Sequence, residues 1–257
     1  MGIDFHNQEN RHSYSARGVD DTWINFMRDL IPSSKRNKAL DIGCGGGIYC
    51  KGLSKLGFKS ITGVDYSKTL LKDAIENCKE YNHINFINGN AFNTGLKSNE
   101  YDIVLERALI HHVNDLEQLF MEVYRVLKKN GLVFIQDRTP EDCVLKGSNT
   151  HIRGYFFSCF PKLSQKEANR RYKSETVKYN LKKVGFKKIE EFKIWEVRKK
   201  YQSKQQLLED LLSRTGRSIL HELSDAELKE LVHYLDKKIH DNDIIEKDRW
   251  TIWLATK

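Results

Sequence analysis

The stretch "ALDIGCGGGIYC", from Ala39 to Cys50, constrains the fold of this chain more than any other part of the sequence. An apolar run contains an acid, Asp41, and is followed by four glycines within five positions. Glycine at that density weakens the interior of a helix or strand. Between a strand and a helix, however, it lets a ligand approach the backbone closely, beside the amide donors of the helix N-terminus. The stretch therefore predicts a ligand-binding turn after a buried strand.

Hydrophobic patterning predicts an alternation of strands and helices. Strands are expected at 38–43, 59–65, 84–91, 101–106 and 132–137, and helices at 48–56, after Ser67 and at 116–127. Ser67 is typical of a helix N-cap, and Asn114 with Glu117 forms a capping-box pattern. The pair Asn130-Gly131 is expected to turn the chain into the fifth strand. Five strands with helical connections predict an α/β fold with a parallel sheet and right-handed crossovers.

The C-terminal part of the chain is expected to be more varied. We predict an irregular, aromatic-rich stretch over 139–162, a helix over 174–184 that ends at Gly185, and a sixth strand near 188–197. A helical segment over 203–239 follows, with Ser224 and Glu227 as a capping box inside it. The last residues, "RWTIWLATK", predict a closing strand because they are rich in aromatic and β-branched side chains.

The carboxyl ends of the predicted strands carry polar residues, which is the first functional signal. They are Asp41–Gly43, Asp65, Asn90, Glu106–Arg107 and Asp137–Arg138. In open α/β sheets, ligands bind outside these ends, where the strand order reverses. We therefore expect a binding site built from these side chains.

Composition narrows the class of protein. The net charge of +8 and the isoelectric point near 9.1 are compatible with nucleic acid or an acidic small molecule as partner. The basic residues are scattered, which favours a solvated surface. No apolar run approaches 18 residues, and the N-terminus lacks signal-peptide features. The five cysteines contain no CxxC pair. We therefore expect a cytoplasmic protein with reduced thiols, no membrane partner and no metal site.

The glycine spacing does not fit a dinucleotide site. That fingerprint requires G-x-G-x-x-G, but Ile48 stands at the third glycine position after Gly43 and Gly45. A carboxylate such as Asp41 would also repel a pyrophosphate, whereas it suits a ligand that bears an ammonium group. The sequence therefore argues against NAD.

The motif "LDIGCGGG" and those after it resemble class I S-adenosylmethionine-dependent methyltransferases, in particular the type 11-like small-molecule group. The resemblance covers residues 39–138 and includes "GVDYS", "NGNAF", "YDIVLERALIHHV" and "RVLKKNGLVFIQD" in the family's order. It implies S-adenosyl-L-methionine as cofactor. It also implies a Rossmann-like, seven-stranded, mostly parallel sheet with helices on both faces, an antiparallel last strand and a helical insertion before it.

The resemblance also assigns cofactor contacts. The implied residues are Asp41, Gly43, Gly45, Gly47, Asp65, Tyr66, Asn90, Ala91, Glu106 and Arg107. Asp65 would bind both ribose hydroxyls, since a carboxylate offers two acceptor oxygens. Asn90 takes the place of the family's acid near the adenine amino group. Glu106 and Arg107 would lie beside the methionine end.

We expect one methyltransferase domain over residues 1–257. Its parts are an N-terminal cap helix region (1–37), a cofactor-binding core (38–138), a lid loop, helix and sixth strand (139–200), a helical insertion (201–247) and the closing strand (248–257). The insertion is similar to that of small-molecule methyltransferases of the trans-aconitate and related groups. Oligomeric state cannot be inferred.

The acceptor side leaves alternatives open. Catalytic candidates are His112, Tyr14 and Arg153, with His111 less favoured. Arg107, Arg138, Arg153 and Arg214 can bind an anionic group or form surface salt bridges. The stretch 153–157 is either a lid over the pocket or a hydrophobic latch onto the core.

These features predict methyl transfer by in-line displacement to a small anionic or polar molecule. The alternatives are a tRNA or rRNA methyltransferase and a cofactor-binding protein without turnover.

Overall fold

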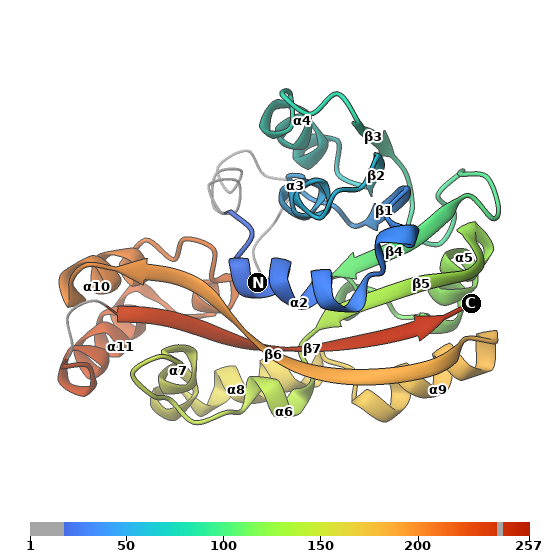
Figure 1. The fold of residues 1–257 in the computed structure, drawn as a ribbon. Coiled ribbons are helices and arrows are strands. Elements are labelled where there is room, and N and C mark those ends of the chain that lie inside the picture. The colour runs from blue at the N-terminus through green and yellow to red at the C-terminus, as the bar shows by residue number, and fades with distance from the viewer. Residues whose placement is uncertain (1–17, 241–243) are drawn as a thin grey trace.

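The computed structural model describes residues 18–240 and 244–257 and contains one seven-stranded sheet. The strands are β1 (Lys38–Ile42), β2 (Ser60–Asp65), β3 (Ile84–Asn88), β4 (Tyr101–Arg107), β5 (Leu127–Asp137), β6 (Lys187–Tyr201) and β7 (Ile244–Thr256). Their order is β3-β2-β1-β4-β5-β7-β6 (Figure 1). β1 to β5 pair in parallel, and β7 runs antiparallel to both neighbours. The expected Rossmann-like sheet with an antiparallel last strand is confirmed.

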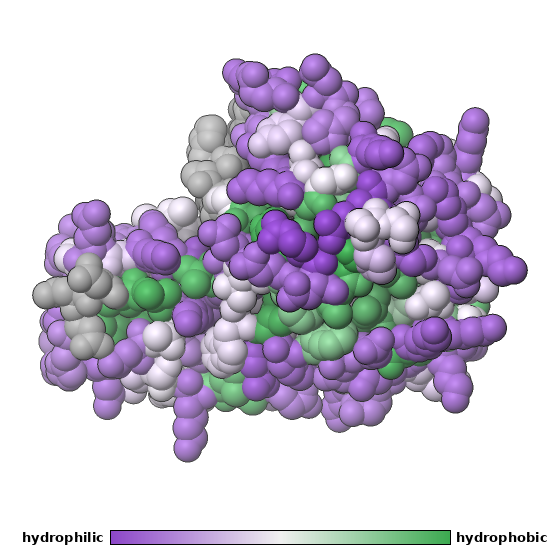
Figure 2. Space-filling view, in the orientation of Figure 1, coloured by the Kyte–Doolittle hydropathy of each residue, from purple (hydrophilic) through white to green (hydrophobic). Residues whose placement is uncertain are grey.

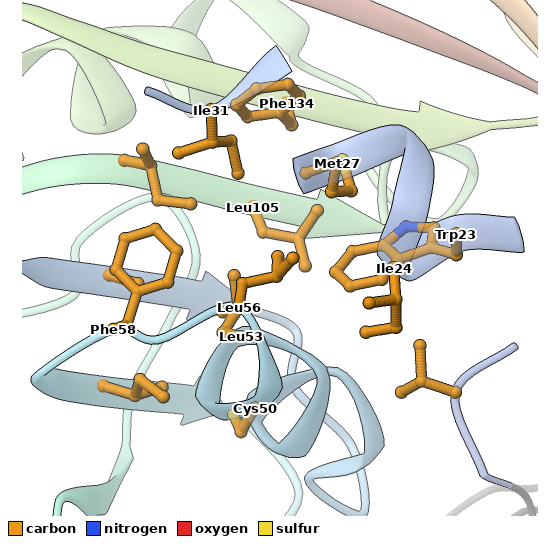
Figure 3. Packing of buried hydrophobic residues seen from close by; sticks show 14 of the residues in the cluster. Trp23, Ile24, Met27, Ile31, Cys50, Leu53, Leu56, Phe58, Leu105 and Phe134 are labelled. Atoms are coloured by element: carbon orange, nitrogen blue, oxygen red, sulfur yellow. The ribbon is translucent and has the colours of Figure 1, made fainter. Parts of the chain in front are cut away.

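Helices cover both faces of the sheet. They include α2 (Asp21–Leu30), α3 (Ile48–Lys55), α4 (Lys68–Asn77), α5 (Leu116–Val126) and α9 (Ser174–Val184). Alternate residues of β4 enter different cores, because successive side chains of a strand point to opposite faces. Ile103 and Leu105 join the core under α2 and α3, whereas Val104 joins the core under α5 and α9. Figure 3 shows the first core, where Trp23 and Met27 of α2 pack beside Leu105.

The last two strands continue past the rest of the sheet. β5 pairs with β7 only from Thr251 to Thr256, whereas β6 pairs with β7 as far as Ile244. The free end of this ribbon carries α10 (Lys204–Leu212), η4 (Ser218–Glu222) and α11 (Asp225–Lys238), and α7 (Arg153–Cys159) packs there as well. We call these helices and the outer ends of β6 and β7 the helical arm. It projects to the left in Figures 1 and 2.

The helical arm has an apolar core of its own. This third cluster contains Phe156 and Phe157 of α7 with side chains of the arm helices, among them Leu207, Leu220 and Leu231. Phe156, Leu207, Leu220 and Leu231 are completely buried. The predicted helical segment over 203–239 is therefore two helices and a 3₁₀ turn folded on one another. Its capping box of Ser224 and Glu227 is confirmed.

The prediction of an irregular stretch over 139–162 is confirmed for residues 144–152 and wrong for the rest. This stretch contains α6 (Pro140–Cys143), α7 and the start of α8 (Pro161–Asn169). α6 begins with a capping box in which Thr139 and Asp142 bond to each other's backbone amides. A proline at N1 supports its first turn, because that position has no helical hydrogen bond to lose.

Two local predictions in the first half need correction. The N-cap of α5 is Asp115, whose carboxylate accepts from Gln118 N at 2.9 Å, rather than Asn114. The turn expected at Asn130-Gly131 lies inside β5, which begins at Leu127 and passes through Asn130 at φ 63°. The caps at Ser67 and Gly185 are confirmed.

Among the described helices, none is both long enough and apolar enough to cross a membrane.

Candidate active site

The glycine loop, residues 43–47, connects β1 to α3. Gly43, Gly45 and Gly47 have φ angles of 75°, 51° and 77°, a region that side chains disfavour. Gly47 is also the N-cap of α3, and a Cβ there would lie 3.0 Å from both Cys78 Sγ and Phe86 Cζ. Two loop amides, Gly43 N and Cys44 N, donate to Val64 O at the end of β2. The loop is thus held against β2 and requires glycine.

Asp65 joins the end of β2 to this loop. Its Oδ2 accepts from Gly45 N and its Oδ1 from Ser67 N, each at 2.8 Å. A carboxylate oxygen can accept a second hydrogen bond, so both remain able to receive a ligand hydroxyl. The next side chain, Tyr66, is 74% exposed. The residue implied for the ribose is therefore fixed in place and accessible.

Asn90 and Ala91 follow β3. Asn90 is exposed, and its Oδ1 accepts from Phe92 N at 2.9 Å, which closes a turn. Ala91 is half-buried against the core under α5 and α9. These residues continue the same strand-end edge as Asp65.

Two buried acids lie at the ends of neighbouring strands β1 and β4. Asp41 is 2% exposed and accepts from Cys50 Sγ at 3.4 Å. Burial raises its pKa to about 7. Glu106 is completely buried, and neither of its oxygens has a hydrogen-bond partner among the residues described. Burial and the charge of Asp137 raise the pKa of Glu106 to about 8.

Asp41 is in register with Leu105, so Asp41 and Glu106 lie on opposite faces of the sheet. A cationic ligand fits the carboxyl of Glu106. A buried carboxyl group without a donor is costly, and an ammonium group brings three donors and the opposite charge. The residues present therefore fit the methionine end of S-adenosylmethionine.

Arg107 lies between aromatic rings on the other side of β4. Its guanidinium carbon is 4.1 Å from the Tyr49 ring centroid and 4.3 Å from that of Trp250. Its Nη2 donates to Glu196 Oε2 at 2.8 Å. This arginine therefore ties α3 and β4 to β6 and β7.

The other three arginines considered for an anionic acceptor also have carboxylate partners. Arg138 pairs with Asp248 at 2.8 Å, Arg214 with Asp225 at 2.9 Å, and Arg153 with Glu167. Arg138, Asp248, Arg153 and Glu167 are buried. The stretch 153–157 is helix α7, whose Phe156 and Phe157 enter the core of the helical arm, which favours the latch over the lid. Tyr14 and Arg17 lie outside the described residues.

His111 and His112 follow β4 in the short helix η3 (Ile110–His112). Their rings lie 3.9 Å apart. His112 is exposed, and desolvation together with His111 lowers its pKa to about 4. His111 is different, because its Nδ1 lies 2.8 Å from Oδ2 of Asp137, the last residue of β5. The less favoured histidine of the sequence analysis is thus the one that pairs with a buried acid.

A cavity of about 260 Å³ opens beside this pair. Its lining residues are His111, Val113, Asn114, Asn169, Arg170, Arg171 and Tyr172. Sequence reasoning missed Arg170 and Arg171, because they follow α8 in a stretch with no recognised motif. Their only sequence signal is an Arg-Arg pair at the end of a helix.

The strand order, the glycine loop after β1 and the acid after β2 together define a class I S-adenosylmethionine-dependent methyltransferase domain. Comparison with known proteins agrees, because residues 40–135 match the family model described as "Methyltransferase domain". This part of the chain matches that family, and the match agrees with the prediction of S-adenosylmethionine as cofactor. The match ends before the helical arm.

Curated proteins with similar sequences are named as methyltransferases. A ubiquinone biosynthesis O-methyltransferase from Pelagibacter ubique is 36% identical over 117 residues, which are 43% of this chain and 48% of that protein. An arsenite methyltransferase from Mus musculus is 34% identical over 131 residues, 44% and 35% of the two chains. The chain thus spans less than half the length of these relatives.

The fold extends over a larger region. A phosphoethanolamine N-methyltransferase 2 from Haemonchus contortus, solved with S-adenosyl-L-methionine, has a TM-score of 0.56 at 21% identity. That comparison covers 99% of this chain and 60% of the other. At this identity it shows a shared fold.

Proposed function

We propose that this protein transfers the methyl group of S-adenosylmethionine to a small molecule. The observation that carries the proposal is the strand-end edge itself: a glycine loop, an anchored Asp65 and two buried acids on adjacent strands. S-adenosylmethionine supplies an electrophilic methyl group when bound. The residues of the chain bind and orient it.

Each group in the site has a distinct binding task. The glycine loop admits the cofactor close to the backbone, Asp65 accepts from the ribose hydroxyls, and Glu106 accepts from the amino group. In-line displacement needs little more from the protein than alignment of donor and acceptor at about 3 Å in a dry pocket. The burial of both acids supports such a pocket.

A small acceptor suits the rest of the molecule better than an RNA. Arg107, Arg138 and Arg153 neutralise buried carboxylates, and Arg214 pairs with the exposed Asp225, so these four arginines supply no basic surface patch. The cavity beside His111 is about 260 Å³, which suits a small molecule or part of one. The curated relatives described above are named for small-molecule chemistry.

Cofactor binding is tested at Asp65. Replacement of this residue by alanine should weaken binding of S-adenosylhomocysteine about 10- to 100-fold in calorimetry, because a hydrogen bond to a charged group contributes about 1.5–3 kcal/mol. Asp65→Asn keeps one acceptor oxygen and should lose less. Glu76→Gln, an exposed carboxylate on α4, is the matched control and should leave the affinity unchanged. Unchanged binding by the alanine variant would contradict the ribose role.

Methyl transfer is tested with methyl-labelled cofactor and two acceptor pools, a metabolite extract and total tRNA and rRNA. We expect label only in the metabolites. Label in RNA, with a transfer rate that falls steeply as salt increases, would support an RNA methyltransferase, because phosphate contacts release counterions. Tight cofactor binding with no label in either pool would indicate a binding protein without turnover.

A further inference from the structure

His111 and Asp137 form a buried pair at the ends of two adjacent strands. His111 lies in η3 directly after β4, and Asp137 ends β5, which pairs with β4. Asp137 accepts from His111 Nδ1 at 2.8 Å, Arg138 N at 2.8 Å and Arg171 Nη1 at 2.6 Å. Burial opposes ionisation of Asp137, but His111, Arg171 and the backbone amide lower its pKa well below the ordinary value. Asp137 is therefore a carboxylate.

This carboxylate determines which nitrogen of His111 carries the proton. An ionised Asp137 accepts Nδ1–H, which leaves the lone pair of the neutral imidazole on Nε2. Burial lowers the pKa of His111 despite the opposing effect of Asp137, and the charges of Arg171 and Arg170 lower it further. His111 is thus neutral near pH 7. Its Nε2 has no hydrogen-bond partner in the described parts of the chain, and the residue lines the cavity.

The other side of the cavity offers guanidinium donors. Arg171 is buried and its Nε has no partner, although Nη1 and Nη2 bond to Asp137 and Glu167. Arg170 directs Nε and Nη2 to Glu167. Arg153, Arg170 and Arg171 together face two carboxylates, those of Asp137 and Glu167, so the cluster has an excess of positive charge. A bound oxyanion would balance it.

The cavity is also close to the cofactor side of the molecule. β1, β4 and β5 are consecutive in the sheet, and adjacent strands lie about 4.8 Å apart. Asp41, Glu106 and Asp137 end these three strands at the same edge. Asp137 ends β5 three residues beyond the register of Asp41, and it lies closer to Glu106, whose pKa its charge raises.

We propose that the cavity binds the anionic group of an acceptor that also carries a hydroxyl or amine, and that His111 Nε2 takes the proton of that hydroxyl or amine. Arg170 and Arg171 hold the oxyanion, and Asp137 orients the imidazole. The acceptor's O–H or N–H bond breaks as its oxygen or nitrogen bonds to the methyl carbon. The electron pair of the broken sulfur–methyl bond stays on sulfur, and His111 later releases its proton to water. This inference rests on the proposed methyltransferase function.

The acceptor class is tested with the labelled metabolite extract, separated by anion exchange. Label is expected in the retained, acidic fraction. Arg170→Met should raise the KM for the purified labelled acceptor about tenfold and change kcat less. Label confined to unretained compounds would overturn the anion site. Cofactor binding without any label in the extract would overturn the proposed function itself, and the inference with it.

The role of His111 is tested by His111→Ala. Transfer should fall about 100-fold or more, which is the usual contribution of a general base, while affinity for S-adenosylhomocysteine stays unchanged. Added imidazole should restore part of the rate, an effect that a structural role would not produce. The matched control is His233→Gln on the exposed face of α11. Full activity of His111→Ala, or loss of activity without rescue, would contradict the role of a base.

A second measurement needs no acceptor. In nitrogen-15 NMR spectra of the protein bound to S-adenosylhomocysteine, His111 should carry its proton on Nδ1 and none on Nε2 at pH 7. Asp137→Asn should change the position of the proton on His111 and leave the signals of His233 unchanged. A proton found on Nε2 of His111 in the unaltered protein would rule out the base.

Discussion

At the scale of single residues, the buried acids fall into two groups. Asp137, Glu167 and Asp248 each face an arginine, and these charges lower their pKa values against the effect of burial. Glu106 is equally buried but has no donor among the residues described, and its pKa rises to about 8. Asp41 has only the weak thiol donor of Cys50. The acids without arginine partners are those at the cofactor side.

Glu106→Gln should therefore stabilise the cofactor-free protein at high pH. The folded protein keeps a proton on Glu106 up to about pH 8, whereas the unfolded chain loses it near 4.5. The contribution of Glu106 to the free energy of unfolding is therefore fully present below pH 4.5 and is lost as the pH rises to 8. Urea unfolding at pH 9 should show a gain of about 2–4 kcal/mol for the glutamine variant and almost none at pH 4.5.

Glu122→Gln provides the matched control of opposite sign. Glu122 bonds to Arg125 and Thr94, which lower its pKa against the effect of burial. Its contribution is present above the ordinary glutamate pKa, so the substitution should destabilise the protein at pH 9. Equal effects of the two substitutions at both pH values would contradict the assignment.

At the scale of elements, the glycine loop depends on conformation and on space. Gly47 and Gly57 both have positive φ, at 77° and 88°. A Cβ at Gly57 would meet no atom within 4 Å, whereas one at Gly47 would press on Cys78 and Phe86. Substitution of Gly57 therefore tests backbone strain alone, whereas substitution of Gly47 tests strain and crowding together.

Gly57→Ala should cost about 1 kcal/mol, the typical penalty for a side chain in the left-handed region. Gly47→Ala should cost about 2–4 kcal/mol, because Cys78 and Phe86 must also move. Thermal unfolding of both variants checks the difference. Equal losses of stability in the two variants would mean that Cys78 and Phe86 move aside at no cost. An unchanged affinity of Gly47→Ala for S-adenosylhomocysteine would show that the glycine loop still binds the cofactor after this substitution.

Elements with local signals could be predicted from the sequence. The caps at Ser67 and Ser224 and the helix end at Gly185 depend on interactions with residues only a few positions away. The local sequence is therefore enough to predict them. Helix α7 was missed because its stability comes from the core of the helical arm, whose residues lie far along the chain. Asp115 caps α5 one residue after the position predicted, which only backbone geometry decides.

The candidate site shows the same division. The cofactor side follows a motif with fixed spacing, so its residues could be proposed in order. The acceptor side could not, because charge pairing there joins distant segments: Arg138 to Asp248, and His111 to Asp137. A sequence shows which arginines exist, but not which carboxylates neutralise them. Arg171, buried between Asp137 and Glu167, is the clearest example.

At the scale of the whole molecule, buried ion pairs join the helices of the helical arm to the outer ends of β6 and β7. Arg217 is the N-cap residue of η4 and bonds to Glu246 of β7 at 2.8 Å and to Asp210 of α10 at 2.5 Å. Tyr201 of β6 accepts from Arg217 at 2.9 Å. Arg217 therefore contacts three elements of the arm, and Arg198 of β6 also pairs with Glu246.

Arg217→Met should loosen the arm and leave the rest of the sheet intact. Arg198 would still pair with Glu246 and Lys199 with Asp210, so the loss of stability should be smaller than the cost of about 3–5 kcal/mol for a buried charge left without any partner. Hydrogen exchange should accelerate in α10 and α11 while β1 and β4 keep their protection. Lys204→Met, which breaks a half-exposed pair with Asp236, should change exchange little. Equal acceleration throughout the protein would show that arm and sheet open together.

The protonated state of Asp41 and Glu106 has a consequence for how the protein takes up its cofactor. With pKa values of about 7 and 8, the two carboxyl groups together hold more than one proton at pH 7 in the cofactor-free protein. An incoming ammonium group beside Glu106 lowers the pKa of that carboxyl group, so uptake expels about one proton into the buffer. Calorimetric titrations in phosphate and in Tris, whose ionisation enthalpies differ, should then give different apparent heats. The affinity should increase with pH between 6 and 8, which makes cofactor loading responsive to the acidity of the surroundings.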